Sequence, residues 1–228
     1  MTRLLALDTT TEACSVALWE ADGLVVYDHT LEPRSHTRRL LPMVESLLAQ
    51  AGWSLTQLAG IACTRGPGSF TGVRVGVSAV QGLAYAAELP VLSLSTLDVL
   101  AWQGVQTQPE CRHWQVAMDA RMGEIYCADY DWDPATGLHR TTPEQLLKPD
   151  RLTLLAGPDV GRIGAGWALP ELAATGASVD AALPHARSVA AWAHELLGRD
   201  LADWQPPHQL QPVYLRDQVA DRRPAAGG

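Results

Sequence analysis

The chain opens with Leu4-Leu5-Ala6-Leu7-Asp8, a short apolar stretch that ends at a carboxylate, and a similar stretch returns as Gln115-Val116-Ala117-Met118-Asp119. A turn follows each aspartate, and then the residues alternate between apolar and polar, at 14–19 and again at 125–130. The same order of strand, carboxylate, turn and strand therefore occurs twice, which indicates a duplicated unit. The sequence therefore predicts an α/β protein of two related lobes.

The hydrophobic spacing places further elements around this repeat. In the first part of the chain we expect strands at 4–7, 14–19, 23–30, 60–64 and 90–94 and helices at 36–51, 70–88 and from 97 to 101. Close spacing predicts antiparallel hairpins for the first three strands, Ser35 or Thr37 should cap the first helix, and Gly52 should end it. In the second part we expect a helix at 143–147, a strand at 152–156 and a helix at 187–197. The expected divisions are a first lobe at 1–105, a reduced second lobe at 106–215 and a frayed tail at 216–228.

Composition excludes several classes of protein. The 228 residues are 47% hydrophobic and 18% charged, which is typical of a globular chain, and the formal net charge is −8. A nucleic-acid binder usually carries a basic stripe, so direct RNA binding is not the first expectation. Lys148 is the only lysine. Apolar runs never reach the roughly 20 residues that span a bilayer, so we expect a cytoplasmic protein without a membrane partner.

A glycine-rich loop joins the strand at 60–64 to the next helix. It reads Arg65-Gly66-Pro67-Gly68-Ser69-Phe70-Thr71-Gly72-Val73-Arg74. Such a loop can offer amide groups to an anion, but the spacing fails the Walker A, dinucleotide and nucleophile-elbow patterns. The spacing therefore favours a structural loop formed by Gly66, Pro67, Gly68 and Ser69, with a helix cap at its end.

The helix that follows the loop is apolar almost all round. Its polar side chains form one narrow stripe: Arg74, Ser78, Gln81, Tyr85 and Glu88. Glycine inside a helix costs about 1 kcal/mol, so the glycines at 72, 76 and 82 indicate close packing. Either the neighbouring helix at 36–51 covers this helix within the same molecule, or a second polypeptide does.

Asp8, Thr9 and Thr10 form the turn after the first strand. In a phosphate-handling fold this carboxylate could hold magnesium through water, and an Asx turn is the structural alternative. The seven histidines lack metal-ligand spacing, so no metal site is predicted.

Several of these motifs together resemble the bacterial TsaB (YeaZ) family. The matching segments are 5–10, 36–42, the decapeptide at 65–74, Met118-Asp119-Ala120-Arg121-x-Gly123-Glu124 and Pro212-x-Tyr214-Leu215-Arg216. The resemblance covers nearly the whole chain, although 131–205 contribute little. It implies an actin-like ATPase or ribonuclease H-like fold and a subunit of the machinery that puts threonylcarbamoyl on a tRNA adenosine.

The resemblance also implies a division of labour between subunits. Catalysis belongs to a paralogue, TsaD, with metal-binding histidines in H-x-x-x-H, and the corresponding stretch here, 93–99, has none; Asp98 is its only strong ligand. A non-catalytic subunit is therefore expected, which forms a homodimer or pairs with TsaD, is joined by the ATPase TsaE, and meets tRNA only through the complex. ATP and magnesium would be used by the partners, with no cofactor bound here. The expected partner-binding residues are Leu40, Val44, Leu47, Gly72, Val73, Gly76, Ala79, Val80 and Leu83.

Two other functions compete with this expectation. An ATP-binding small-molecule kinase of the same fold would use Asp8 and the turn after it to grip phosphate with magnesium, but the second lobe shows no clear glycine-rich phosphate loop. A peptidase needs a nucleophile–base pair or a metal cluster, and the sequence suggests neither.

Overall fold

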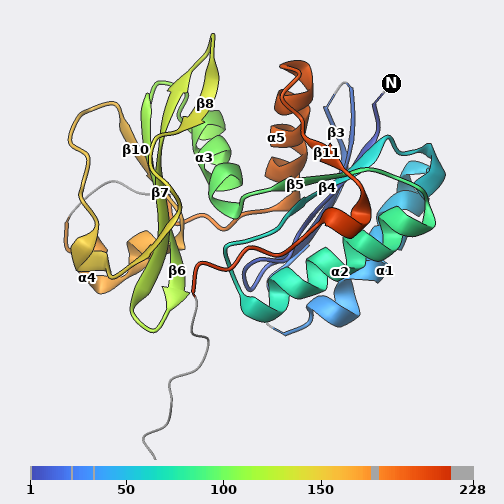
Figure 1. Cartoon of the computed structure of the whole chain (residues 1–228), viewed down its shortest axis with the longest axis horizontal. Helices are drawn as coiled ribbons and strands as arrows, with labels where there is room; N and C mark the ends of the chain where they lie inside the picture. The colour runs from blue at the N-terminus through green and yellow to red at the C-terminus, as the bar shows by residue number, and fades with distance from the viewer. Residues whose placement is uncertain (1, 22, 33, 176–179, 217–228) are drawn as a thin grey trace, which may run out of the picture.

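The computed structural model describes residues 2–21, 23–32, 34–175 and 180–216. These residues form two β-sheets, with helices packed outside and between them (Figure 1). No helix among the described residues is long and apolar enough to cross a lipid bilayer.

The first sheet has the strand order β11-β5-β4-β1-β2-β3. Its strands are β1 (Leu4–Asp8), β2 (Cys14–Glu20), β3 (Gly23–Thr30), β4 (Gly60–Thr64), β5 (Val91–Leu94) and β11 (Trp204–Gln205). β1 pairs antiparallel with β2, β2 antiparallel with β3, and β4 parallel with both β1 and β5. The predicted hairpins are therefore confirmed.

The second sheet has the order β10-β6-β7-β8, with β9 also paired to β7. Its strands are β6 (His113–Arg121), β7 (Glu124–Asp133), β8 (Gly137–Arg140), β9 (Gln145–Leu147) and β10 (Val160–Ile163). β6 is antiparallel to β7, β7 is antiparallel to β8, and β10 is parallel to β6.

The two sheets repeat one topology. The run β3-β2-β1-β4 in the first sheet corresponds to β8-β7-β6-β10 in the second, strand for strand and with the same directions. This arrangement confirms the predicted α/β fold of the actin-like ATPase and ribonuclease H-like class, with two related lobes and a reduced second one.

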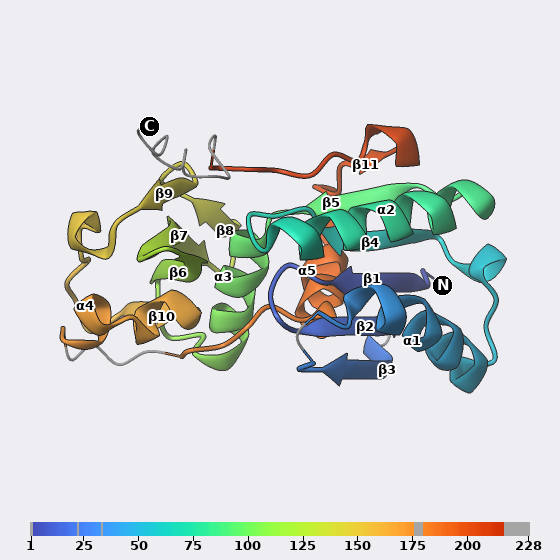
Figure 2. The ribbon, with the colours of Figure 1, turned by 90° about the horizontal axis from the view of Figure 1, so that it is seen from below.

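The helices are arranged in layers about these sheets. They are α1 (His36–Ala51), α2 (Phe70–Ala86), α3 (Thr96–Thr107), α4 (Pro170–Ala173) and α5 (Ala186–Gly198), with 3₁₀ turns at Leu55–Gln57, Pro149–Arg151, Ala165–Ala168 and Pro207–Gln209. α1 and α2 cover one face of the first sheet, and α5 covers the other (Figure 2). α3 packs between α5 and the second sheet, and α4 lies near that sheet's far side.

The alternation of β1 divides the core into two clusters. Leu4 and Ala6 point into a cluster between the sheets, whereas Leu5 and Leu7 point into a cluster under α1 and α2. All four side chains are at most 1% exposed. This explains why the sequence of β1 is apolar without alternation, since the strand is covered on both faces. A third, smaller cluster lies on the far face of the second sheet, around Trp167. The four cysteines are free and buried.

Three local predictions are wrong. The expected helix at 143–147 is β9, because residues 145–147 pair with β7, and this tertiary pairing overrides a short apolar run. The expected strand at 152–156 is irregular backbone. Ser35 does stand before α1, but its hydroxyl donates to the Glu32 carbonyl oxygen instead of capping the helix.

The chain does not stay in the second lobe after it leaves the first. α5 packs on β1 and β2, and β11 pairs with β5 at the edge of the first sheet. Part of the predicted second lobe at 106–215 therefore lies on the first sheet, which the spacing of apolar residues did not indicate. The predicted frayed tail beyond Arg216 lies outside the described residues.

Candidate functional site

The carboxylate at the end of β1 is closed to solvent. Asp8 is 1% exposed, and its carboxylate accepts hydrogen bonds from the hydroxyls of Thr10 (2.9 Å) and Thr64 (2.5 Å). Burial raises the pKa of Asp8 to about 6, although these hydrogen bonds oppose the shift. Thr9 donates its hydroxyl to the Gly72 carbonyl oxygen at 2.8 Å. The residues predicted to grip phosphate, Asp8, Thr9 and Thr10, are thus engaged in internal bonds, and Asp8 is not accessible to a bound phosphate.

The glycine loop seals this turn. Ser69 donates its backbone N–H to the Thr10 carbonyl oxygen at 2.7 Å, and its hydroxyl accepts from Gly72 N–H at 3.3 Å, which caps α2. A Cβ at Gly68 would overlap the Thr10 carbonyl oxygen, and one at Gly72 would overlap that of Thr9. These glycines allow helix and turn to touch, so the loop of Gly66, Pro67, Gly68 and Ser69 has a structural role.

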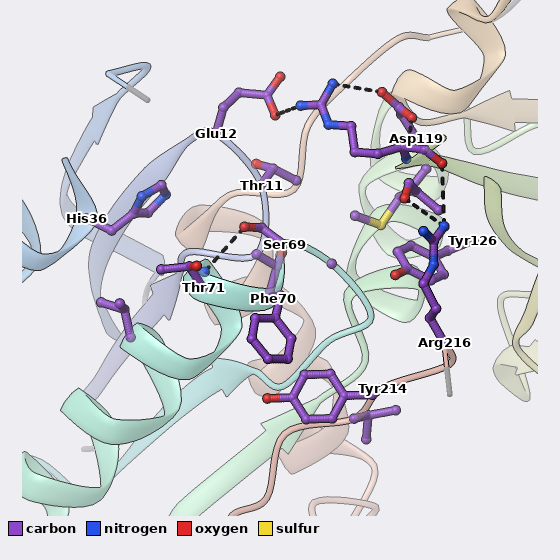
Figure 3. A pocket seen from close by; sticks show the side chains of 18 of the residues that line it. Thr11, Glu12, His36, Ser69, Phe70, Thr71, Asp119, Tyr126, Tyr214 and Arg216 are labelled. Carbon is purple, nitrogen blue, oxygen red and sulfur yellow. Dashed lines mark hydrogen bonds and ion pairs between the residues drawn. The ribbon is translucent and has the colours of Figure 1, made fainter. Parts of the chain in front are cut away.

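A cleft of about 640 Å³ opens between the lobes beside this loop (Figure 3). We call it the interlobe cleft. Its first-lobe wall comes from the turn at 10–12, the start of α1 and the start of α2; its second-lobe wall comes from the end of β6 and from Tyr126. The segment at 213–216 completes it, with Phe70 and Tyr214 side by side, their ring centroids 5.5 Å apart.

Two arginines that line the interlobe cleft form ion pairs. Arg121 contacts the carboxylates of Asp119 (2.9 Å) and Glu12 (3.6 Å), and so joins the two lobes. Arg216 binds the carboxylate of Glu124 at 2.6 Å. Figure 3 shows the first bridge running over the opening, with Arg216 beside Tyr126 on the second-lobe side.

Most of the predicted partner-binding residues face the chain's own core. The side chains that are at most 2% exposed are Leu40, Val44, Leu47, Val73 and Val80. Gly72 and Gly76 are buried against Thr9. Helix α2 is apolar at these positions because they face the first sheet and the turn after β1, whereas the two alternatives drawn from the sequence were cover by the helix at 36–51 or by a second polypeptide. Only Ala79 and Leu83 of the predicted set are partly exposed.

A different apolar surface is open on the same two helices. Leu41 of α1 is 47% exposed and Tyr85 of α2 is 81% exposed. A groove of about 330 Å³ runs between the helices, with Leu41, Val75 and Ala79 among its lining residues. We call this the α1–α2 surface. Leu41 was missed because its neighbour Leu40 fits the buried stripe, and spacing alone does not separate adjacent leucines.

The stretch at 93–99, which lacks the histidines of the catalytic paralogue, holds an ionic network. Asp98 accepts hydrogen bonds from the hydroxyl of Tyr130 (2.9 Å) and from the Arg140 guanidinium (2.6 Å). Arg140 also contacts Glu144 at 3.1 Å, and Ser95 donates to the same carboxylate. One guanidinium therefore lies between two carboxylates here. Within the described ranges, no three His, Cys, Asp or Glu residues are placed to hold a metal ion.

The chain is similar in sequence to one protein family model and to several curated proteins. A family model described as "TsaD: tRNA N6-adenosine threonylcarbamoyltransferase" matches residues 30–186. A curated protein of Escherichia coli K12, "tRNA threonylcarbamoyladenosine biosynthesis protein TsaB", is 43% identical, and the alignment covers 96% of each chain. The chain belongs to the TsaB (YeaZ) family. A Haemophilus influenzae relative of the same description is 37% identical over 95% of this chain and 94% of its own.

Solved structures of the family share the fold. "YeaZ from Pseudomonas aeruginosa" superposes with a TM-score of 0.81 at 36% identity, covering 93% of this chain and all of that one. Another Pseudomonas aeruginosa structure, described as an uncharacterized protein with similarity to peptidase YEAZ, gives 0.85 at 38% identity, covering 95% and 100%. The resemblance inferred from the motifs is therefore confirmed over nearly the whole chain, and the relatives' name connects the family with threonylcarbamoyladenosine biosynthesis.

Proposed function

We propose that this chain is a non-catalytic subunit in the formation of threonylcarbamoyladenosine on tRNA. It docks through the α1–α2 surface onto a catalytic subunit of the TsaD type, and pairs with a second copy of itself through the same surface. The observation that carries the proposal is the groove between α1 and α2, with Leu41, Val75 and Ala79 in its lining, together with the exposed Tyr85 on α2. Exposed apolar groups of this kind, gathered on one face, are typical of protein–protein interfaces.

The environments of two carboxylates, Asp8 and Asp98, support an accessory role. Asp8 is buried next to the glycine loop, and Asp98 is ion-paired with Arg140. We therefore place the catalytic chemistry in the TsaD-type partner, and the use of ATP and magnesium in the partner subunits, which include an ATPase of the TsaE type. With a net charge of −8, this chain would meet tRNA through the complex, because phosphate contacts favour basic surfaces.

The test is a charged substitution in the groove. Ala79→Arg places a long cation among Leu41 and Val75, where docking would bury it unpaired. Ala174→Arg is the matched control, because Ala174 is exposed on the second lobe. Gly76 is unsuitable, since a side chain there would strike Thr9 and disturb folding.

We expect Ala79→Arg to weaken self-association and binding to the TsaD-type subunit at least tenfold, as measured by sedimentation velocity and calorimetry. The rate of threonylcarbamoyl transfer by the reconstituted complex should fall with it, while Ala174→Arg keeps both. A folded Ala79→Arg protein that associates and supports transfer like the parent chain would refute the assignment of this surface.

A further inference from the structure

The last described segment crosses from one lobe to the other. Residues 210–216, here called the C-terminal clasp, leave the first lobe after the 3₁₀ turn Pro207–Gln209 and end at the hairpin between β6 and β7. Figures 1 and 2 both show this red segment passing beside α2 and then reaching the second lobe. It forms one wall of the interlobe cleft.

The clasp is firmly seated in the first lobe. Leu210 is fully buried, and its carbonyl oxygen accepts a hydrogen bond from the Gln81 side chain at 2.9 Å. Val213 donates its N–H to the Arg65 carbonyl oxygen at 2.8 Å. A Cβ at Gly66 would lie 2.6 Å from the Val213 carbonyl oxygen. The backbones of the glycine loop and of the clasp are therefore in contact, with no space for a side chain between them. Tyr214 then accepts a hydrogen bond from Arg74 of α2 at 2.7 Å.

The side chain of Arg216 makes the polar attachment to the second lobe. Arg216 donates to the carboxylate of Glu124 at 2.6 Å and to the carbonyl oxygens of Ala120 (3.1 Å) and Arg121 (3.4 Å). Its side chain is only 16% exposed. Charge-assisted hydrogen bonds from a planar guanidinium are directional, so Arg216 holds the β6–β7 hairpin in one position relative to the clasp.

The two sides of the lobe boundary are joined differently. Behind the interlobe cleft, one apolar cluster continues from Leu4 and Ala6 of the first sheet to Trp114 of the second, through α3 and α5. Apolar contacts are non-directional, and on the same side Arg199, after α5, donates to the carbonyl oxygens of Pro134 and Ala135 in the second lobe. A small rotation of the second lobe would therefore turn about this side. Across the mouth of the cleft, the contact of Arg121 with Glu12 is 3.6 Å long, and its side chains are 73% and 42% exposed. Such an exposed pair contributes little.

We propose that the C-terminal clasp sets the opening between the two lobes, with Arg216 as its fastening point. Releasing Arg216 from Glu124 and the hairpin carbonyls lets the second lobe rotate about the apolar cluster and widens the interlobe cleft, as in hinge motions of two-lobed proteins. The clasp also touches α2 through Tyr214 and Arg74. A protein seated on α2 would therefore contact the element that fixes the lobe angle.

The test measures the distance between the lobes in the full chain. Spin labels on Glu45→Cys in α1 and Asp150→Cys in the second lobe lie at exposed positions, whereas the four native cysteines are buried. With the labelled chain diluted in excess unlabelled parent, so that only distances within one copy count, pulsed electron paramagnetic resonance should give one narrow distance distribution for the parent. Arg216→Ala should broaden it and shift its mean to a longer distance. Arg3→Ala is the control, because Arg3 pairs with Glu20 at 2.8 Å within the first sheet.

A second variant tests the same contact with less risk that the protein fails to fold. Glu124→Gln keeps the side-chain size but removes the charge that Arg216 contacts, so it should shift the distribution in the same direction by a smaller amount. The proposal is overturned if Glu124→Gln and any folded Arg216→Ala protein give the distribution of the parent, or if Arg3→Ala shifts it equally.

Discussion

The turn after β1 and the turn after β6 occupy equivalent places in two sheets of the same topology, yet their chemistry differs. Asp8 is buried beneath α2 and its glycine loop, and its pKa is raised to about 6. The Asp119 side chain is 25% exposed and contacts Arg121 at the rim of the interlobe cleft. Two aspartates at matching positions thus have different environments because, among the residues that the structure describes, a long helix lies over the turn of the first lobe alone.

The two lobes nevertheless share one device. After β4, Gly68 and Gly72 lie against the carbonyl oxygens of Thr10 and Thr9; after β10, Gly166 lies against the backbone of Ala117. In both lobes the parallel strand is therefore followed by a glycine that lets the chain touch the end of the central strand. The duplication visible in the strands therefore extends into the loops, where Gly66-Pro67-Gly68 and Gly164-Ala165-Gly166 share one spacing.

The largest expected effect tests this shared device. Gly72→Ala and Gly166→Ala should each lower the free energy of unfolding by about 2–3 kcal/mol, because each new methyl group meets backbone atoms that cannot move aside. Gly82→Ala in the same helix as Gly72 meets open space and should raise it by about 0.5–1 kcal/mol. Urea unfolding measures all three, and a neutral Gly166→Ala beside a costly Gly72→Ala would break the parallel between the lobes.

The next effect separates the two aspartates. Because the pKa of Asp8 is raised in the folded protein, the unfolded chain releases this proton first as pH rises. The free energy of unfolding of the parent should therefore fall by about 2–3 kcal/mol between pH 4 and pH 6 on account of this group. Asp8→Asn removes that loss, so its stability relative to the parent should grow across the window.

Stability curves from urea unfolding at several pH values measure the difference, and parallel curves for parent and Asp8→Asn would contradict it. At the second turn, Asp119→Asn alters a partly exposed group. It should change the free energy of unfolding at pH 7 by less than about 1 kcal/mol.

The smallest effect concerns the link between the turns. Arg121 and Glu12 lie 3.6 Å apart with exposed side chains. A double-mutant cycle with Arg121→Ala and Glu12→Gln should give a coupling free energy below about 0.5 kcal/mol, falling further at high salt. A coupling above 1 kcal/mol would show that this pair, and not Arg216 alone, holds the mouth of the cleft.

Local pattern predicted the first half of the chain well for a physical reason. Strands β1 to β5 and helices α1 and α2 each have strong periodicity and a clear stop, such as Gly52 after α1, where φ is 66°. Helix α3 was expected only from 97 to 101, and it continues to Thr107. Between residues 131 and 185 the elements are short, and pairing with β7 decides their form. The helix expected at 143–147 became β9 in this way, because a run of a few apolar residues fits either structure.

The candidate site was only partly predictable. The apolar character of α2 correctly indicated that more than one of its faces is covered, but it did not indicate which residues pack against the sheet. Val73 and Val80 went to the core, whereas Tyr85, which the sequence grouped with the polar stripe, is the most exposed of the large apolar side chains described. The pairing of Arg216 with the β6–β7 hairpin joins segments far apart in the chain, which no local spacing can reveal.

By itself, the sequence determined the strand–carboxylate–turn repeat, the helices of the first lobe and the family, because these depend on neighbouring residues and on motifs with fixed spacing. Only the tertiary structure decided that Asp8 is enclosed while Asp119 stays partly open, and which side of α2 remains for a partner. Burial and electrostatics depend on what packs above a residue, and that covering comes from distant parts of the chain.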